Sequence, residues 1–136
     1  MSMRCPNCKN EKFRPWEGEV AVMGVTVLGR GSSCTKCGDV LIAEQDLKQN
    51  ERQAAAVLAA RGVRTGKEFK FVRKVAGLQA NELATLIDVR PETVSRWERD
   101  EVEIPRLAAF VLSQFLEHPV VTKKKLEAFA TSIRTR

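Results

Sequence analysis

Two short motifs, Cys5-Pro6-Asn7-Cys8 and Cys34-Thr35-Lys36-Cys37-Gly38, set the architecture of the first part of this 136-residue chain. Together they contain every cysteine of the sequence. Two residues between cysteines allow both thiolates of a tight turn to point at one centre, and a second such turn completes the four-coordinate shell that zinc prefers. Glycine after the last cysteine suits a backbone that reverses with a positive φ angle. The spacing predicts one structural zinc ion with four thiolate ligands: Cys5, Cys8, Cys34 and Cys37.

Other chemistries of four cysteines fit this sequence less well. Two disulfides would require an oxidising compartment, and the N-terminal residues contain no apolar secretory segment. A redox dithiol requires one Cys-x-x-Cys on a thioredoxin-like unit rather than two spaced pairs. A catalytic zinc keeps an open position beside histidine or carboxylate ligands, whereas the only histidine is the distant His118. Iron can be bound by the same four thiolates, so the ligand set alone does not distinguish a zinc site from an iron site.

The composition indicates a soluble, basic protein with room for two small domains. The formal net charge is +6 at pH 7. Four thiolates and Zn²⁺ together contribute about −2, which leaves roughly +4. This balance permits nucleic-acid binding but does not require it. Because no transmembrane span, signal peptide or low-complexity tract is visible, we expect a reduced, cytoplasmic protein without a membrane partner.

An α+β organisation follows from the pattern after the first motif. Residues 19–30 (EVAVMGVTVLGR) are rich in valine around Gly24 and predict the hairpin of a zinc ribbon, with a third short strand over residues 40–43. Residues 44–60 contain no proline or glycine and predict a helix. The narrow apolar face of this helix fits either a connector that lies against one domain or a dimer contact, and both roles stay open. The expected parts are a zinc ribbon (1–43), a linker helix (44–66) and an all-α domain (67–136).

The second half has the pattern of a helix-turn-helix. Amphipathic helices are expected over residues 67–76, 78–87 and 104–116, and His118-Pro119 predicts a helix stop. After a tight turn, residues 91–99 form a helix that opens with proline, which suits a first helical turn. Val94 and Trp97 lie three residues apart and would face the core. Five side chains of this helix then stay largely outside: Glu92, Thr93, Ser95, Arg96 and Arg99.

Four groups of residues carry a more specific pattern: Gly77-Leu78, Glu82-Leu83-Ala84, Val89 and Thr93-Val94-Ser95-Arg96-Trp97-Glu98. They resemble the lambda-repressor-like (XRE) family, and the resemblance covers about half of the chain. Asp88 and Asp100 stand where that family often has glycine, but aspartate tolerates left-handed geometry better than most residues. Gln79 and Ala80 stand where the family usually has Thr and Gln, so Gln79 or Asn81 would have to replace the DNA contact of that glutamine.

The exposed side chains of residues 91–99 are the candidates for DNA recognition. Arg96 is the first candidate for base readout, because a guanidinium near the middle of a recognition helix can contact guanine O6 and N7. A phosphate clamp or an ion pair with Glu92 is the alternative. Thr93 would meet a thymine methyl group, and Glu92 would accept from cytosine N4 or stabilise the helix N-terminus. Phosphate contacts are expected from Gln79, Asn81, Arg90, Ser95 and Arg99. Because one recognition helix reads only a few base pairs, a symmetric dimer on two half-sites is expected.

The whole chain, with its two cysteine motifs followed by Ser95-Arg96-Trp97-Glu98, resembles the MqsA/YgiT-type antitoxins of bacterial toxin–antitoxin modules. That resemblance implies a homodimer formed largely through the C-terminal domain and bound to a palindromic operator. It also implies that the zinc domain holds an RNA-cleaving toxin encoded by an adjacent gene. Glu92 replaces an asparagine that contacts DNA in better-known relatives, so the operator sequence does not transfer.

A stand-alone XRE-type regulator with a structural zinc ribbon and no toxin partner is the alternative. An enzyme is not expected, because the sequence offers no convergent nucleophile, base and oxyanion group. A zinc-responsive sensor is not expected either, because a closed thiolate shell disfavours metal exchange.

Overall fold

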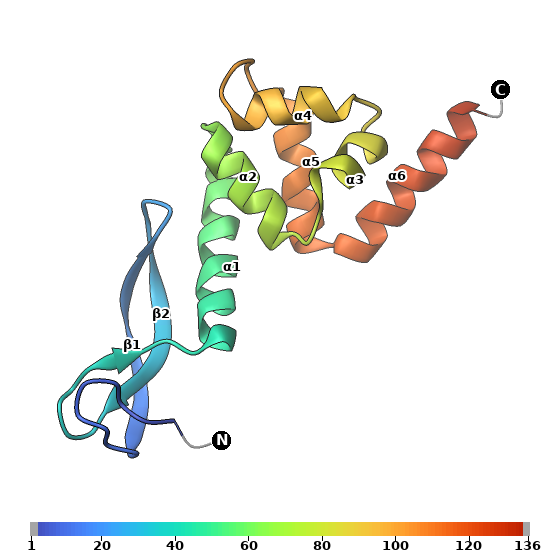
Figure 1. Cartoon of the computed structure of the whole chain (residues 1–136). Helices are drawn as coiled ribbons and strands as arrows, with labels where there is room; N and C mark the ends of the chain where they lie inside the picture. Colours follow the sequence, from blue (N-terminus) through green and yellow to red (C-terminus); the bar gives the residue numbers. More distant parts are fainter. Residues whose placement is uncertain (1–2, 135–136) are drawn as a thin grey trace. The chain divides into compact units, whose positions relative to one another are not determined.

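The computed structural model describes residues 3–134 and has an α+β fold in which three strands precede a series of helices (Figure 1). The chain divides into two compact units, Met1–Ala54 and Ala55–Arg136. We call them unit 1 and unit 2. The division falls inside helix α1 (Glu44–Arg61). No helix in the described part of the chain is long and apolar enough to cross a membrane.

Unit 1 is built on a three-stranded antiparallel sheet in the order β1-β2-β3. Strands β1 (Phe13–Val22) and β2 (Val25–Cys34) are joined by Met23 and Gly24, whose φ angles of 52° and 76° match the two-residue turn that follows the natural twist of a hairpin. The short strand β3 (Val40–Leu41) pairs with the end of β2. The predicted hairpin is confirmed.

The strands are longer than the valine-rich segment predicted. Pairing continues outward to Phe13 opposite Cys34, so β2 ends at the second cysteine motif. The added positions have few aliphatic side chains, and two of them, Arg14 and Glu17, face solvent, so the valine pattern did not reveal this part of the strands. Trp16 covers Gly18 on the same face, where a Cβ atom would lie 2.4 Å from the indole ring. The tryptophan therefore supplies the apolar cover that glycine lacks.

Helix α1 closes the outer edge of β2 through two amide side chains. Asn50, which is fully buried, accepts the backbone N–H of Arg30 at its Oδ1 atom (3.2 Å), and Gln53 donates to the backbone carbonyl of Leu28 (3.0 Å). Close approach requires Gly29, because a Cβ atom there would lie 2.3 Å from Val20 and 3.3 Å from the Asn50 amide. The first part of α1 is therefore an integral part of unit 1.

Unit 2 is a bundle of helices: α2 (Gly66–Val75), α3 (Ala80–Leu86), α4 (Pro91–Glu98), α5 (Arg106–Glu117) and α6 (Pro119–Arg134). The predicted helices are present, with ends shifted by one or two residues. Val94 and Trp97 are buried as predicted, and Trp97 packs edge-on against Phe69 with ring centroids 5.7 Å apart. The other large side chains that are fully buried in this unit are Leu58, Val72, Leu83 and Leu112.

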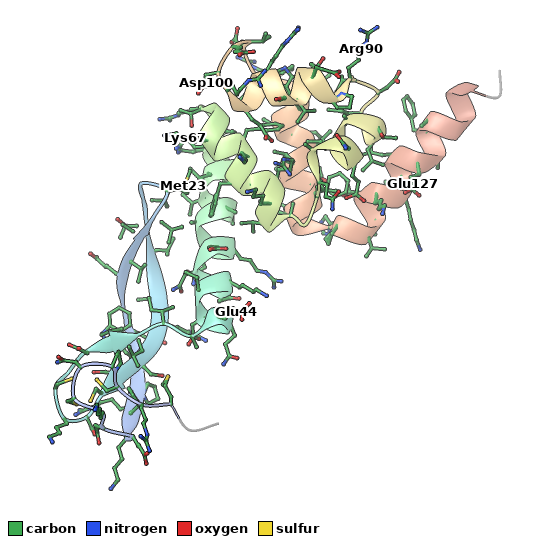
Figure 2. All side chains as sticks on the ribbon, viewed as in Figure 1. Met23, Glu44, Lys67, Arg90, Asp100 and Glu127 are labelled. Carbon is green, nitrogen blue, oxygen red and sulfur yellow. The ribbon has the colours of Figure 1, made fainter. Side chains whose placement is uncertain are left out.

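Two aspartates make the turns on either side of α4. Asp88 and Asp100 both have a φ of 58°, which confirms the left-handed geometry expected where related sequences have glycine. Asp100 lies beside the first turn of α2 (Figure 2), and its carboxylate accepts the backbone N–H of Gly66 at 2.7 Å. A Cβ atom on Gly66 would lie 2.3 Å from the carbonyl oxygen of Glu98. The start of α2 and the end of α4 therefore touch through their backbones.

Candidate metal centre and nucleic-acid interface

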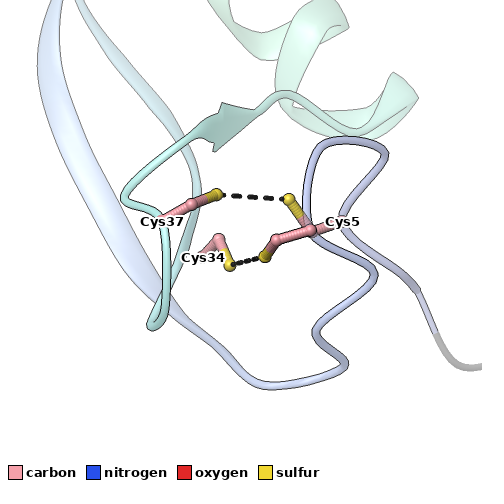
Figure 3. Close-up of side chains that lie close together, drawn as sticks. Cys5, Cys34 and Cys37 are labelled. Atoms are coloured by element: carbon pink, nitrogen blue, oxygen red, sulfur yellow. Dashed lines mark hydrogen bonds between the residues drawn. The ribbon is translucent and has the colours of Figure 1, made fainter.

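The four cysteine thiols of unit 1 converge on one point. Their Sγ atoms all lie within 4.8 Å of one another, and the Cys5–Cys37 and Cys8–Cys34 pairs are each separated by 3.5 Å (Figure 3). In a tetrahedron with zinc–sulfur bonds of about 2.3 Å, neighbouring sulfurs lie about 3.8 Å apart. The cluster is therefore compatible with a zinc site of four thiolates.

The two cysteine turns have the same backbone hydrogen bonds. In the first, Lys9 donates to the carbonyl of Cys5 (2.7 Å) and Cys5 donates to the carbonyl of Asn10 (2.9 Å). In the second, Gly38 donates to the carbonyl of Cys34 (3.0 Å) and Cys34 donates to the carbonyl of Asp39 (2.8 Å). Two equivalent turns thus present two thiols each.

The equivalence places Lys9 where the second turn has glycine. Gly38 has a φ of 80°, as its sequence position predicted, and Lys9 has a φ of 63°. A lysine in this region is strained because its Cβ atom crowds the following carbonyl. Lys9 was not predicted as part of this site, although Lys9 follows Cys8 just as Gly38 follows Cys37.

Asn10 links the two turns and was also missed. Its side-chain amide donates to Cys34 Sγ (3.4 Å), to Thr35 Oγ1 (3.0 Å) and to the carbonyl of Lys12 (2.9 Å). An N–H group directed at a sulfur stabilises the thiolate and orients it. No sequence signal distinguishes this asparagine from a solvent-exposed loop residue.

The thiols differ in how readily they ionise. The backbone N–H of Cys37 lowers the pKa of Cys34, with further help from the Asn10 amide, and these bonds outweigh burial to give a value of about 6. The backbone N–H of Asn10 also favours ionisation of Cys8, but burial and the three neighbouring thiols raise the Cys8 pKa to about 12. A metal that needs four thiolates therefore displaces protons from this cluster, and its affinity falls as pH falls.

In unit 2 the exposed side chains of α4 form one continuous stripe. Glu92, Arg96 and Arg99 are exposed, and the helical period places them on the side opposite the buried Val94 and Trp97. Thr93 and Ser95 are half-buried at the margins of the stripe. The predicted inward and outward sides of this helix agree with the structure.

The remaining candidate DNA contacts lie at helix N-termini. Arg90 is the exposed residue before α4 and projects away from the helices of unit 2 (Figure 2). Gln79 precedes α3 and Asn81 lies in its first turn, both exposed. Helix N-termini favour phosphate oxygens, so these positions suit the role predicted for them. Contacts of all eight candidate residues with DNA stay predictions.

Two ion-pair observations refine those roles. Among the described side chains, Arg96 forms no ion pair with Glu92, which was one alternative to base readout; the other alternative, a phosphate clamp, stays open. Arg99 pairs with Glu101 at 3.2 Å, and both side chains are more than half exposed. Such a pair is weak and exchanges readily for a phosphate.

Comparison with protein-family models matches residues 70–117 to the helix-turn-helix family HTH_3. The match begins within α2 and ends with α5. It fits a family of DNA-binding XRE-type regulators rather than enzymes. No curated protein matched the chain. Residues 70–117 therefore form an XRE-type helix-turn-helix domain, in a chain whose other unit carries a four-cysteine cluster.

Proposed function

We propose that this protein is an antitoxin and transcriptional autorepressor. Its helix-turn-helix binds palindromic operator DNA as a homodimer, and its zinc domain neutralises a cognate RNA-cleaving toxin from an adjacent gene. The observation that carries the proposal is the joining, in one chain, of an XRE-type domain at residues 70–117 to a separate unit with clustered cysteines. Unit 1, which holds the cysteines, gives the chain a surface that DNA recognition by the helix-turn-helix does not require.

The DNA-binding part of the proposal rests on the exposed stripe of α4. Arg96, at its centre, is free of the ion pair with Glu92 and reads a base, while Thr93 and Glu92 contact neighbouring bases. Arg90, Ser95 and Arg99, together with Gln79 and Asn81 at the start of α3, hold phosphates.

The zinc part rests on the small core of unit 1. Apart from cysteines, the buried hydrophobic residues of its described part are Val27 and Ala54. Such a core does not stabilise a domain alone. Zinc bound by Cys5, Cys8, Cys34 and Cys37 would supply folding free energy on the order of 10 kcal/mol or more. We therefore assign the metal a structural role.

Co-expression with the product of the adjacent gene tests the antitoxin role. We expect the neighbour to arrest growth when expressed alone, and to co-purify with this protein through unit 1 when both are expressed. The variant Arg96→Ala is the matched control, because it should still restore growth while losing repression of the promoter. A neighbour that is harmless and does not bind would reject the antitoxin role and leave the stand-alone XRE-type regulator, which the helix-turn-helix match favours equally.

A further inference from the structure

Asn10 contacts three of the four cysteines of the cluster, each through a different group. Its backbone carbonyl accepts the N–H of Cys5 at 2.9 Å, and its backbone N–H is directed at the sulfur of Cys8. Its side-chain amide donates to the sulfur of Cys34 at 3.4 Å. One residue of the first turn therefore touches cysteines of both Cys-x-x-Cys motifs.

The acceptors around this amide fix its orientation. Besides the Cys34 sulfur, Nδ2 of Asn10 lies 2.9 Å from the carbonyl oxygen of Lys12 and 3.0 Å from Thr35 Oγ1. Reversing the amide would place its oxygen against a carbonyl and a thiolate, neither of which can donate a hydrogen bond. Asn10 is also half-buried, although the residues directly before and after it are exposed. The N–H groups of its side chain are therefore held toward the cluster.

At the corresponding place in the second turn, the side chain cannot donate to a sulfur. This place is held by Asp39, whose carbonyl accepts the N–H of Cys34 just as the carbonyl of Asn10 accepts the N–H of Cys5. An ionised aspartate has no N–H or O–H to give. Cys37 of the same turn is exposed, whereas Cys34 is buried. The first turn therefore supports the cluster in a way that the second does not.

We propose that Asn10 is a positioning residue of the zinc site, which holds the Cys34 thiolate in place and thereby strengthens retention of the metal. The proposal deepens the zinc part of the proposed function and rests on it. The bond from the amide to a thiolate is charge-assisted, and such bonds are roughly twice as strong as neutral ones. A metal ion leaves when its ligands turn away from it, so a ligand whose orientation is fixed by a further hydrogen bond retains the ion better.

Competition between the full chain and a chelator for Zn²⁺ tests the proposal. Asn10→Ala should lower the zinc affinity by about 10–100-fold, which is the usual cost of removing a residue that orients a metal ligand. Asn7→Ala is the matched control and should keep the affinity of the wild type. Asn7 is an exposed asparagine of the same turn, and its side chain makes no hydrogen bond to the residues that the structure describes.

Substitution of zinc by cobalt separates a bond to sulfur from a link between the two turns. Co²⁺ binds the same kind of ligands and has a sulfur-to-metal charge-transfer band. When a hydrogen bond to sulfur is removed, the sulfur electrons are held less tightly and this band moves to lower energy. Asn10→Ala should show the shift at saturating cobalt. Thr35→Val, which removes the hydroxyl beside Asn10 but keeps the bond to Cys34, should not.

Two results would overturn the positioning role. One is an Asn10→Ala variant that binds zinc as tightly as the wild type, and the other is an equal loss of affinity in Asn10→Ala and Thr35→Val with no shift of the cobalt band. Failure of the proposed function looks different. A wild type that binds neither metal loses the zinc assignment together with this role. A wild type whose zinc affinity depends on Asn10, but which does not bind the product of the adjacent gene, keeps the positioning role and loses the antitoxin role.

Discussion

Arg73 and Glu98 form a two-point ion pair that fastens α2 to the last residue of the recognition helix. Nε donates to Oε2 at 2.7 Å and Nη2 donates to Oε1 at 3.2 Å, with the two side chains only 8% and 11% exposed. The third nitrogen, Nη1, donates to the carbonyl of Leu78 at 2.8 Å. One guanidinium therefore holds α2, the start of the turn to α3, and α4 in a single arrangement.

Breaking this pair should destabilise unit 2 strongly. Glu98→Ala leaves the Arg73 charge buried without a partner, and we expect a loss of about 3–5 kcal/mol in the free energy of unfolding. Urea unfolding followed by circular dichroism measures it. Glu101→Ala is the control, because it removes the exposed pair with Arg99 and should cost less than about 1 kcal/mol. Equal losses in the two variants would contradict the role given to burial.

Lys9→Gly should stabilise the metal-loaded form of unit 1. The substitution relieves the left-handed strain at a φ of 63°. Part of that gain is offset by the greater freedom of glycine in the unfolded chain, so we expect a net gain of about 0.5–1 kcal/mol in the stability of the metal-loaded form. Competition with a chelator, read as zinc affinity, measures the change. Lys9→Ala removes the same charge but keeps the Cβ atom, so a gain in that variant would point to charge rather than strain.

Asp100 contributes both a left-handed turn and a helix cap. Asp100→Gly keeps the turn and loses the hydrogen bond to the Gly66 N–H, which should cost about 1 kcal/mol. Asp100→Ala loses both features and should cost about 1 kcal/mol more. Thermal unfolding of the two variants separates the contributions. Identical melting temperatures would show that the turn geometry carries no strain for alanine.

Unit 2 should lose stability in acid through Glu68. Burial raises the pKa of this carboxyl, but hydrogen bonds from the Arg61 side chain and the Arg64 backbone N–H outweigh burial and lower the pKa below its ordinary value of 4.5. A lowered pKa in the folded state means that the stabilisation is present above the unfolded pKa. It is lost as the pH falls through the folded pKa.

The measurement is urea unfolding between neutral pH and pH values below the folded pKa, in a Trp16→Phe background so that Trp97 alone reports on unit 2. Glu68→Gln should reduce the decline in the free energy of unfolding of unit 2 as the pH falls. Glu44→Gln, whose side chain is 84% exposed, should leave it unchanged. A decline that Glu68→Gln does not alter would assign the effect to other carboxyls.

A substitution in one unit should leave the fold of the other unit unchanged. Arg96→Ala should cost about 1–3 kcal/mol of operator discrimination while zinc content stays the same. Cys34→Ser should unfold unit 1 and leave the helices of unit 2 intact, as nuclear magnetic resonance spectra of each variant would show. Loss of DNA binding by a Cys34→Ser protein that remains dimeric would contradict this independence.

Local rules predicted the features of this chain that depend on neighbouring residues. The Cys-x-x-Cys spacing predicted the thiol cluster, and the sides of α4 followed from the three-residue interval between Val94 and Trp97. The left-handed geometry of Asp88 and Asp100 was expected from the resemblance to sequences that have glycine at these positions. These properties are set within a few residues, so a sequence displays them directly.

Features that join distant segments were not predictable in this way. The Asn10–Cys34 contact, the Gly66–Asp100 cap and the closing of β2 by Asn50 each connect residues at least 20 positions apart. The polar ends of β1 and β2 were missed because their pairing comes from the backbone rather than from apolar side chains. An apolar groove lined by residues of the α3–α4 turn, α5 and α6 needs three segments at once, so no single helix pattern reveals it.

The hydrogen bonds from Asn50 to Arg30 and from Gln53 to Leu28 have a consequence for the survival of the protein in a cell. These two hydrogen bonds make the sheet and the first part of α1, up to Ala54, depend on each other. A helical segment as short as this first part is only marginally stable by itself. Under the zinc assignment, removing the metal would disorder both together and expose basic residues there, including Lys48 and Arg52, to trypsin-like proteases. Metal supply would then set the lifetime of the first unit, while the helix-turn-helix persists as a resistant fragment.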